Sequence, residues 1–423
     1  MKVGLHHNGH AIGAVLAAVL TVTTVAACGS SSDNSAGTSN VDTAVLGTAN
    51  VATGEPVTIG FISEGKAATY DTSAELSAAR VAVDYINNYL GGLRGHKVEL
   101  KTCESKGSPA AATDCANQMI GAGVVAVAEG ALGLVDQTID VLSPAGVPLL
   151  LNYSTSQKSL TSPNVFGLMN GVSAVFGTSA TLAKENHVTK AAMVTLDVPT
   201  ATGAANQLGK LTFGNAGSAL DVVTIPPGTP DVTSQITAAK HNDPGLWAVL
   251  GNTNFCSVVL KAIKTADRNS KIVVNDRCVD PSISSSIPGG FEGVQVGTTA
   301  NLDPNTKDVK VFQAAISKYG SGLRVDANAA GGWQPMLGLA RALNASQGQD
   351  VTRQAVLDGL HSAPAQPYPL TDGIEFQCNG QAFPLSANIC ATDVIVATAN
   401  KSGELGDYRV LRTDASLFVM PSH

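Results

Sequence analysis

Residues 57–102 read VTIGFISEGKAATYDTSAELSAARVAVDYINNYLGGLRGHKVELKT, and the unit they encode recurs along the chain. The alternating and then continuous apolar residues at 57–62 predict a strand. Thr72 and Glu75 have the spacing of a capping box, which marks the start of a helix. Apolar residues then follow at steps of three and four, on one predicted helix face: Leu76, Ala79, Val83, Ile86 and Leu90. A pair of glycines ends that helix, and residues 97–102 are the next predicted strand.

The alternation of strands and helices continues with short connections. Further helices are predicted at 110–122, 134–142, 175–186, 201–213, 231–242, 257–266 and 334–343, and further strands at 124–128, 147–151, 191–196, 221–225, 246–251 and 271–275. This order predicts an α/β fold of doubly wound parallel sheets. Because there is one series before residue 172 and another after it, we expect two lobes. A ligand cleft is then expected at the carboxyl ends of their strands.

The amino-terminal region differs in composition from the rest of the chain. The apolar run at 11–25 is shorter than the ~20 residues that a membrane-spanning helix needs. It precedes small residues and Cys28, a pattern that resembles the lipobox of bacterial lipoproteins. The resemblance implies that residues 1–27 are a signal peptide and that the Cys28 sulfur is diacylated on the outer face of the cell membrane. A buried helix that happens to end in cysteine is the alternative. Residues 28–56, rich in small polar residues, are predicted to be a flexible tether.

Composition bounds the class of protein. Of the 423 residues, 44% are apolar and 14% are charged, which is typical of a globular protein with a sizeable core. The formal net charge is −7, and the chain has no long run of Lys or Arg. We therefore expect no nucleic acid partner.

Six cysteines remain after Cys28, and their spacing suggests disulfides. In an oxidising compartment they predict three bonds, and six cysteines allow about fifteen connectivities. We favour the three pairs that are local in sequence: Cys103 with Cys115, Cys256 with Cys278, and Cys378 with Cys390. Free or metal-binding thiols are the alternative. A Cys-x-x-Cys motif or a neighbouring histidine cluster would support a metal, and the sequence has neither, so no metal site is expected.

Several segments, taken together and in order, resemble one known family. They are VTIGFI at 57–62, AARVAVDYINN at 78–88, GGLRGHKVEL at 91–100, GVVAV at 123–127 and AGVPL at 145–149. The set resembles type I periplasmic (solute-) binding proteins, in particular Leu/Ile/Val-binding-like receptors of ABC transporters. The resemblance implies two lobes joined by three crossings that close on a ligand. It places 57–171 with 298–365 in lobe 1, and 172–297 with 366–423 in lobe 2.

The resemblance also implies which residues of lobe 1 bind the ligand. Residues 152–156 follow a predicted strand and precede a helical turn. There Ser154, Thr155 and Ser156 would hold a carboxylate with hydroxyls and backbone amides, since a helix amino terminus attracts anions. A helix cap with ordinary loop polarity is the alternative. Tyr70, in the first strand–helix loop, would pack an aromatic ring on the ligand, or else be an exposed loop residue.

Four further residues are implied by the resemblance. Asp276 follows the last strand of the second series and would pair with a ligand ammonium. Asp280 could substitute for it, and Asp276 could instead cap a turn. Thr200 and Asn252 follow two other strands of that lobe, where they would face the cleft or form turns. Trp333 opens the helix at 334–343 and would be an apolar wall of the cleft or part of the core.

Two departures from the family pattern bear on the ligand. The stretch after the third strand, GALGL at 130–134, has no hydroxyl residue where the family has them. The first loop carries Glu64 and Lys66 in place of small apolar residues. Both departures favour a ligand that is more apolar, or differently charged, than an ordinary amino acid.

The sequence gives no support to an enzyme. It contains neither His-Glu-x-x-His nor Gly-x-Ser-x-Gly, and the histidines are scattered. We therefore expect no catalytic residue and no cofactor. The expected function is a monomeric, lipid-anchored, extracytoplasmic solute-binding protein. It would deliver a small polar ligand, an amino acid or a related compound, to the permease of an ABC importer. A ligand sensor of the same fold and a surface interaction protein without a ligand are the alternatives.

Overall fold

The computed structural model of the chain describes residues 41–66, 71–130, 133–154 and 156–419. The predicted signal peptide, Cys28, Tyr70 and Thr155 lie outside these ranges. Of Ser154 and Thr200, the structure describes the backbone but not the side chain.

The first lobe is built on a five-stranded sheet in the order β2-β1-β3-β4-β5, and all its neighbouring strands are parallel. The strands are β1 (Gly54–Ser63), β2 (His96–Glu104), β3 (Ala126–Glu129), β4 (Leu149–Ser154) and β5 (Val165–Asn170). Every residue of β3 and β5 is buried, which explains their continuous apolar sequence. The sequence thus predicted the strands of this sheet that precede β5.

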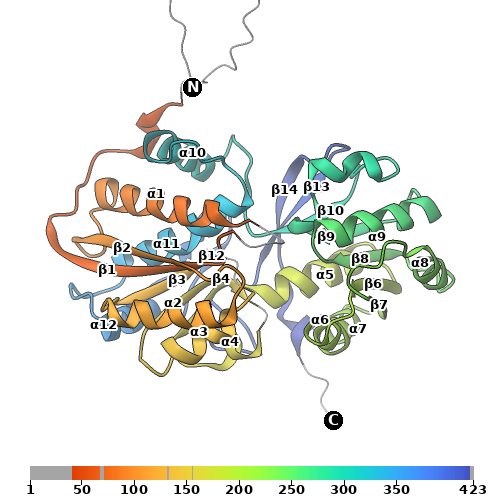
Figure 1. Cartoon of the computed structure of the whole chain (residues 1–423), viewed down its shortest axis with the longest axis horizontal. Helices are drawn as coiled ribbons and strands as arrows, with labels where there is room; N and C mark the ends of the chain where they lie inside the picture. Colours follow the sequence, from red (N-terminus) through yellow and green to blue (C-terminus); the bar gives the residue numbers. More distant parts are fainter. Residues whose placement is uncertain (1–40, 67–70, 131–132, 155, 420–423) are drawn as a thin grey trace, which may run out of the picture. The chain divides into compact units, whose positions relative to one another are not determined.

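Helices cover both faces of this sheet, as Figure 1 shows. One face packs in a large hydrophobic cluster with α1 (Ser73–Tyr89), α10 (Lys307–Tyr319), α11 (Ala327–Ala345) and α12 (Arg353–Ser362). The other face packs against α2 (Pro109–Gly121) and α3 (Val135–Leu142), with the short α4 (Gln157–Thr161) beside α3. The doubly wound arrangement expected for the first lobe is therefore present.

The second lobe is built on a seven-stranded sheet in the order β14-β13-β10-β9-β8-β6-β7. Its strands are β6 (Lys190–Leu196), β7 (Ala219–Ile225), β8 (Leu246–Leu250), β9 (Ile272–Asn275), β10 (Gln295–Thr298), β13 (Val394–Ala399) and β14 (Leu405–Leu411). β13 runs antiparallel to both of its neighbours, β10 and β14, so the sheet is mixed at one edge. Figure 1 shows β13 and β14, in blue, beside β10.

The helices of the second lobe include two π-helical turns. The α-helices are α5 (Thr178–Glu185), α6 (Pro199–Ala204), α7 (Lys210–Asn215), α8 (Thr233–Lys240) and α9 (Thr253–Ala266). The π-helical turns are η2 (Ser173–Gly177), which leads into α5, and η3 (Ala205–Gly209), which joins α6 to α7. Such turns are rare and recur at functional sites. The helices predicted at 175–186 and 201–213 are thus correctly placed but less regular than expected.

The chain passes between the lobes three times, and the third crossing lies later than we expected. The first two crossings follow β5 and β10. The boundary expected at residue 365 is wrong, because Tyr368, Phe376 and Cys378 belong to the hydrophobic cluster of the first lobe. The short strands β11 (Gln366–Pro367) and β12 (Glu375–Phe376) form their own two-stranded sheet there. This segment carries no periodic pattern that would assign it to either lobe.

The expected tether also ends earlier than residue 56. A short 3₁₀ turn, η1 (Thr43–Leu46), packs against α10, and Leu46 is only 3% exposed. Since β1 begins at Gly54, the segment from residue 41 onward belongs to the first lobe. The two apolar residues Val45 and Leu46 are too few to give a sequence signal within a polar stretch.

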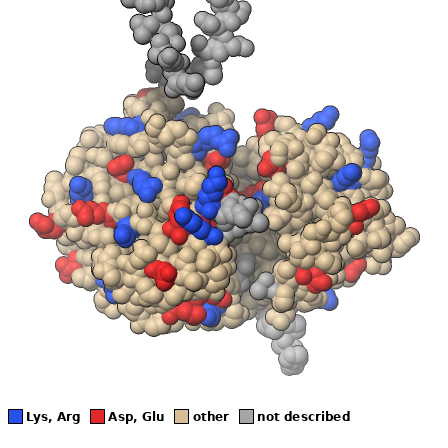
Figure 2. Space-filling model, in the orientation of Figure 1, with Lys and Arg blue, Asp and Glu red and all other residues tan. Residues whose placement is uncertain are grey.

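All six predicted disulfide cysteines are paired in the structure as Cys103–Cys115, Cys256–Cys278 and Cys378–Cys390. On the face drawn in Figure 2, the basic and acidic side chains of the described residues are interspersed. Among the helices that the structure describes, none combines the length and the apolar character needed to span a bilayer.

Candidate ligand cavity

A cavity of about 430 Å³ lies at the carboxyl ends of the strands of the second lobe. The ends of β6, β8, β9 and β10 all contribute to it, as expected for a ligand site in a doubly wound fold. Its lining residues are Tyr153, Ala174, Val175, Phe176, Thr195, Leu196, Ala201, Ala204, Leu250, Gly251, Asn275, Asp276, Arg277, Gly297, Thr298 and Thr299. Tyr153, from β4, comes from the first lobe, and Gly297–Thr299 lead into the second crossing. The cavity therefore adjoins segments that would move if the lobes changed their angle.

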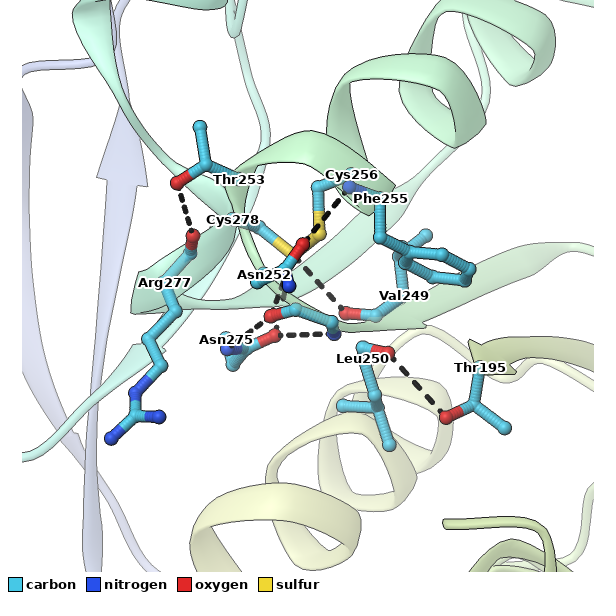
Figure 3. The surroundings of a disulfide bond; sticks show 11 residues. Thr195, Val249, Leu250, Asn252, Thr253, Phe255, Cys256, Asn275, Arg277 and Cys278 are labelled. Carbon is cyan, nitrogen blue, oxygen red and sulfur yellow. Dashed lines mark hydrogen bonds between the residues drawn. A yellow bond between two sulfur atoms is a disulfide. The ribbon is translucent and has the colours of Figure 1, made fainter. Parts of the chain in front are cut away.

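The charged end of the cavity is a 3₁₀ turn, η4 (Asp276–Cys278), held in place from three sides. The Asn275 side chain accepts a hydrogen bond from the Gly251 backbone N–H at 3.2 Å and donates one to the Gly251 carbonyl at 3.0 Å. The Thr253 hydroxyl donates to the Arg277 carbonyl at 3.1 Å, and Cys278 is bonded to Cys256 of α9. Figure 3 shows these contacts around the disulfide. The turn that carries Asp276 and Arg277 is therefore firmly positioned.

Gly251 is required by this packing. A Cβ atom at this position would lie 2.2 Å from the Phe255 ring, which is far closer than van der Waals contact. The glycine thus lets the end of β8 pass close to the first turn of α9.

The charged turn interacts electrostatically with Tyr153 of the first lobe. Tyr153, followed by Asp276, raises the pKa of Arg277 above its ordinary value, so the guanidinium stays charged. Burial raises the pKa of Asp276, while Arg277 opposes that effect. Burial likewise raises the pKa of the Tyr153 hydroxyl. The cavity therefore holds one firm positive charge beside a carboxyl group whose anionic form is disfavoured.

The segment expected to hold a ligand carboxylate forms part of a strand and a helix cap. Ser154 ends β4 and pairs with Asn170 of β5. Ser156 caps the short α4, where its hydroxyl accepts a hydrogen bond from the Ser159 backbone N–H at 3.0 Å. Tyr153 is the residue of this segment that lines the cavity. The cap that we gave as the alternative is thus present at Ser156.

The three residues expected on the second lobe lie at different positions relative to the cavity. Asp276 lines the cavity. Asn252 is exposed and caps α9, accepting a hydrogen bond from the Phe255 N–H at 3.1 Å, while its neighbour Gly251 lines the cavity. Thr200 lies in α6, next to the lining residue Ala201.

Trp333 is a core residue and not a cleft wall. It is 1% exposed within α11, with ring centroids 5.5 Å from Tyr85 and 5.0 Å from Phe312. Residues 329–340 of α11 are all buried, including the polar Gln334, so the sequence pattern could not reveal which face meets the cleft.

Sequence reasoning missed Arg277 and Tyr153. Arg277 directly follows the turn residue Asp276, after a correctly predicted strand, so its position alone could have indicated a cleft residue. Tyr153 lies inside the segment 152–156, where Ser154, Thr155 and Ser156 were expected to bind a ligand carboxylate. Among the described residues, no cluster of His, Cys, Asp and Glu has an arrangement that could hold a metal ion.

Known proteins resemble both the sequence and the fold. Residues 56–403 match the model of a family described as periplasmic binding protein. No curated protein matches the sequence. One similar solved structure is the branched-chain amino acid transporter substrate-binding protein LivJ from Streptococcus pneumoniae, in complex with isoleucine. It is 18% identical, with a TM-score of 0.64, and the match covers 84% of this chain and 99% of that one.

Two other similar solved structures are of proteins named for different ligands. A fatty acid ABC transporter substrate-binding protein from Thermomonospora curvata is 14% identical, with a TM-score of 0.68 and coverage of 86% and 94%. A solute-binding protein of an ABC transporter from R. palustris, in complex with 4-hydroxybenzoate, is 14% identical, with a TM-score of 0.67 and coverage of 85% and 98%. At these identities the likeness shows the fold alone.

Proposed function

Since the chain belongs to the periplasmic binding protein family, we propose that it captures a small organic solute for an ABC importer. The observation that carries this proposal is the cavity, which is lined from both lobes and adjoins the second crossing. Binding there would favour closure of the lobes, since a ligand stabilises the state in which it makes more contacts. The function is binding and release, with no covalent chemistry.

The ligand class that follows from the family resemblance is an amino acid or a related compound. The proposed site contains Arg277, whose guanidinium would pair with the carboxylate of such a ligand. The apolar remainder of the wall would contact its side chain.

The proposal includes attachment to the membrane through a diacylated Cys28. The lipobox-like sequence that ends at Cys28 supports it. The mature protein would act as a monomer on the outer face of the membrane, beside the permease that receives the ligand.

A thermal-shift screen of the purified protein over amino acids, amides, short organic acids and peptides tests the binding. A ligand at about 100 times its dissociation constant should stabilise the protein by about 2.7 kcal/mol. Uptake of the best ligand is then compared between cells with and without the gene. Loss of uptake supports transport, whereas binding with unchanged uptake supports a sensor. A screen in which no compound raises the melting temperature contradicts the proposal.

A further inference from the structure

Arg277 carries the only guanidinium among the described residues that line the cavity, and it has no carboxylate partner there. Arg277 is exposed, and within the described residues it forms no salt bridge. Its backbone carbonyl accepts a hydrogen bond from Thr253, but Figure 3 shows the side chain extending away from that contact and from the disulfide. The backbone of Arg277 is therefore fixed, and its side chain lines the cavity together with its hydrogen-bond partner Tyr153.

Other arginines of the chain are used differently. Arg94 donates hydrogen bonds to the Gln347 carbonyl at 2.8 Å and the Asp350 carbonyl at 2.7 Å, and so holds the end of α11. Arg341 pairs with Asp308 at 3.2 Å. These two side chains have protein partners for their charge and their donors. Arg277 has a hydrogen bond with the Tyr153 hydroxyl, but no carboxylate of the described residues forms an ion pair with it, which points to an anionic ligand.

We propose that Arg277 anchors the ligand by its carboxylate, and that the ligand is a small monocarboxylate with an apolar body. The proposal rests on the proposed function, because it names the class of solute that the same cavity takes. A guanidinium presents parallel N–H donors that match the two oxygens of a carboxylate. An aliphatic or aromatic acid has the one charge and the apolar surface that this requires.

The remaining wall of the cavity fits an apolar body. Seven of the lining side chains are hydrocarbon, and they come from η2, α6 and the ends of β6 and β8: Ala174, Val175, Phe176, Leu196, Ala201, Ala204 and Leu250. The volume of about 430 Å³ is in the usual range for small-molecule sites. Burial of such a body against these side chains supplies affinity, while the single charge fixes its orientation.

The site is less suited to a ligand ammonium. Asp276 is the only carboxyl group among the described lining residues, and burial raises its pKa, which disfavours the anion that an ammonium needs. Glu64 and Glu75 also act on Arg277 from the first lobe, but they are 4% and 1% exposed. Glu64 accepts a hydrogen bond from the Gly133 N–H at 2.8 Å, and Glu75 accepts one from the Ser63 hydroxyl at 2.6 Å. Neither lines the cavity.

Calorimetric titration of the purified protein with matched compounds tests the ligand class. Leucine and 4-methylpentanoate share an alkyl chain and a carboxylate and differ by the ammonium. Benzoate, benzamide and benzylamine share a ring and differ in charge. We expect at least one of the two acids to bind, and to bind at least 10-fold more tightly than its amine-bearing or neutral counterpart. Tighter binding of leucine than of 4-methylpentanoate, or of benzylamine than of benzoate, would overturn the proposal.

Substitution of the arginine tests the anchor. Arg277→Gln should weaken binding of the acid at least 100-fold, because it removes the charge and the paired donors. Arg277→Lys keeps the positive charge but lacks the parallel N–H donors, so it should give an intermediate loss of affinity. Arg268→Gln, an exposed arginine of the same lobe, is the matched control and should leave the affinity unchanged. Unchanged affinity in Arg277→Gln would contradict the anchor.

The two proposals fail in different ways. If neither acid binds but another compound of the wider screen does, the ligand class is wrong and the binding function stands. If no compound of the screen binds, both proposals are contradicted.

Discussion

Glu129, the last residue of β3, is a buried carboxylic acid that forms no ion pair with any of the described residues. Its side chain is 0% exposed, and neither carboxyl oxygen has a hydrogen-bond partner among the described residues. The nearby Thr138 hydroxyl donates instead to the Val135 carbonyl at 2.8 Å. Burial raises the pKa of Glu129 to about 8, the nearby Thr138 hydroxyl acts against this effect, and Glu75 and Glu64 add smaller contributions to it. At neutral pH this residue therefore keeps its proton, which avoids the cost of a buried, unpaired charge.

Replacing Glu129 with glutamine should make the stability of the protein depend less on pH. The carboxyl ionises near pH 4.5 in the unfolded chain and near pH 8 in the folded one. Between these values the unfolded state binds fewer protons, so the free energy of unfolding of the natural protein falls as the pH rises. Glutamine carries no proton to lose. The variant should gain stability relative to the natural protein between pH 5 and pH 8, by an amount on the order of a few kcal/mol.

Urea unfolding of both proteins at pH 5 and pH 8 measures this effect. Glu99→Gln makes the same chemical change at an exposed position of β2 and should leave the pH dependence as it is. If Glu129→Gln and the natural protein keep parallel pH profiles, the buried carboxyl does not hold its proton.

At the scale of elements, helices α1 and α11 cross so closely that glycine is needed at the contact. A Cβ atom on Gly332 would lie 1.9 Å from the backbone carbonyl oxygen of Glu75. The obstacle is backbone, which cannot rotate away as a flexible side chain would. Glycine inside a helix costs about 0.5–1 kcal/mol of stability relative to alanine. The packing that the close crossing of α1 and α11 allows offsets this cost.

Gly332→Ala should destabilise the protein by about 1–3 kcal/mol, since the two helices must separate to admit the methyl group. The change is measured as a lower midpoint of urea unfolding. Gly214→Ala in α7 is the matched control, because that glycine is exposed and a Cβ atom there would meet nothing within 4 Å. The control should be unchanged or up to about 1 kcal/mol more stable. Equal responses of the two variants would contradict the close crossing.

The elements that the sequence predicted are those whose signal lies among neighbouring residues. The alternation at 57–62 and the repeat that includes Leu76 and Val83 both reflect burial within one element, and β1 and α1 lie where they were expected. The late third crossing and the packing of Leu46 depend on contacts between distant parts of the chain. No local pattern records such contacts.

The prediction of the cavity residues was limited in the same way, because a local sequence pattern does not record contacts between distant parts of the chain. Asp276 was expected because it follows a strand of the second lobe, and it lines the cavity. Arg277 and Tyr153 were missed because the choice of residues followed hydroxyl groups typical of the family. For Trp333 the sequence left two positions open, a cleft wall or the core, and the structure places it in the core, where almost all of α11 is buried.

At the scale of the whole molecule, the covalent links are compatible with movement between the lobes. The disulfide Cys103–Cys115 joins β2 to α2 within the first lobe, and Cys256–Cys278 joins α9 to η4 within the second. Cys378 and Cys390 both pack in the cluster of the first lobe. No disulfide in the described part of the chain links the two lobes. Each bond can therefore stabilise one lobe without opposing a hinge.

Attachment of the whole molecule to the membrane is predicted to depend on Cys28. Two acyl chains on one cysteine give stable anchoring, whereas a single chain gives only marginal binding. Because the acyl chains on Cys28 would be the anchor, Cys28→Ala should move the protein from the membrane fraction to the soluble fraction, and from the detergent phase to the aqueous phase of a Triton X-114 partition. Ligand affinity should not change, because the residues that line the cavity lie between 153 and 299. A Cys28→Ala protein that stayed in the membrane fraction would show that another segment holds it there.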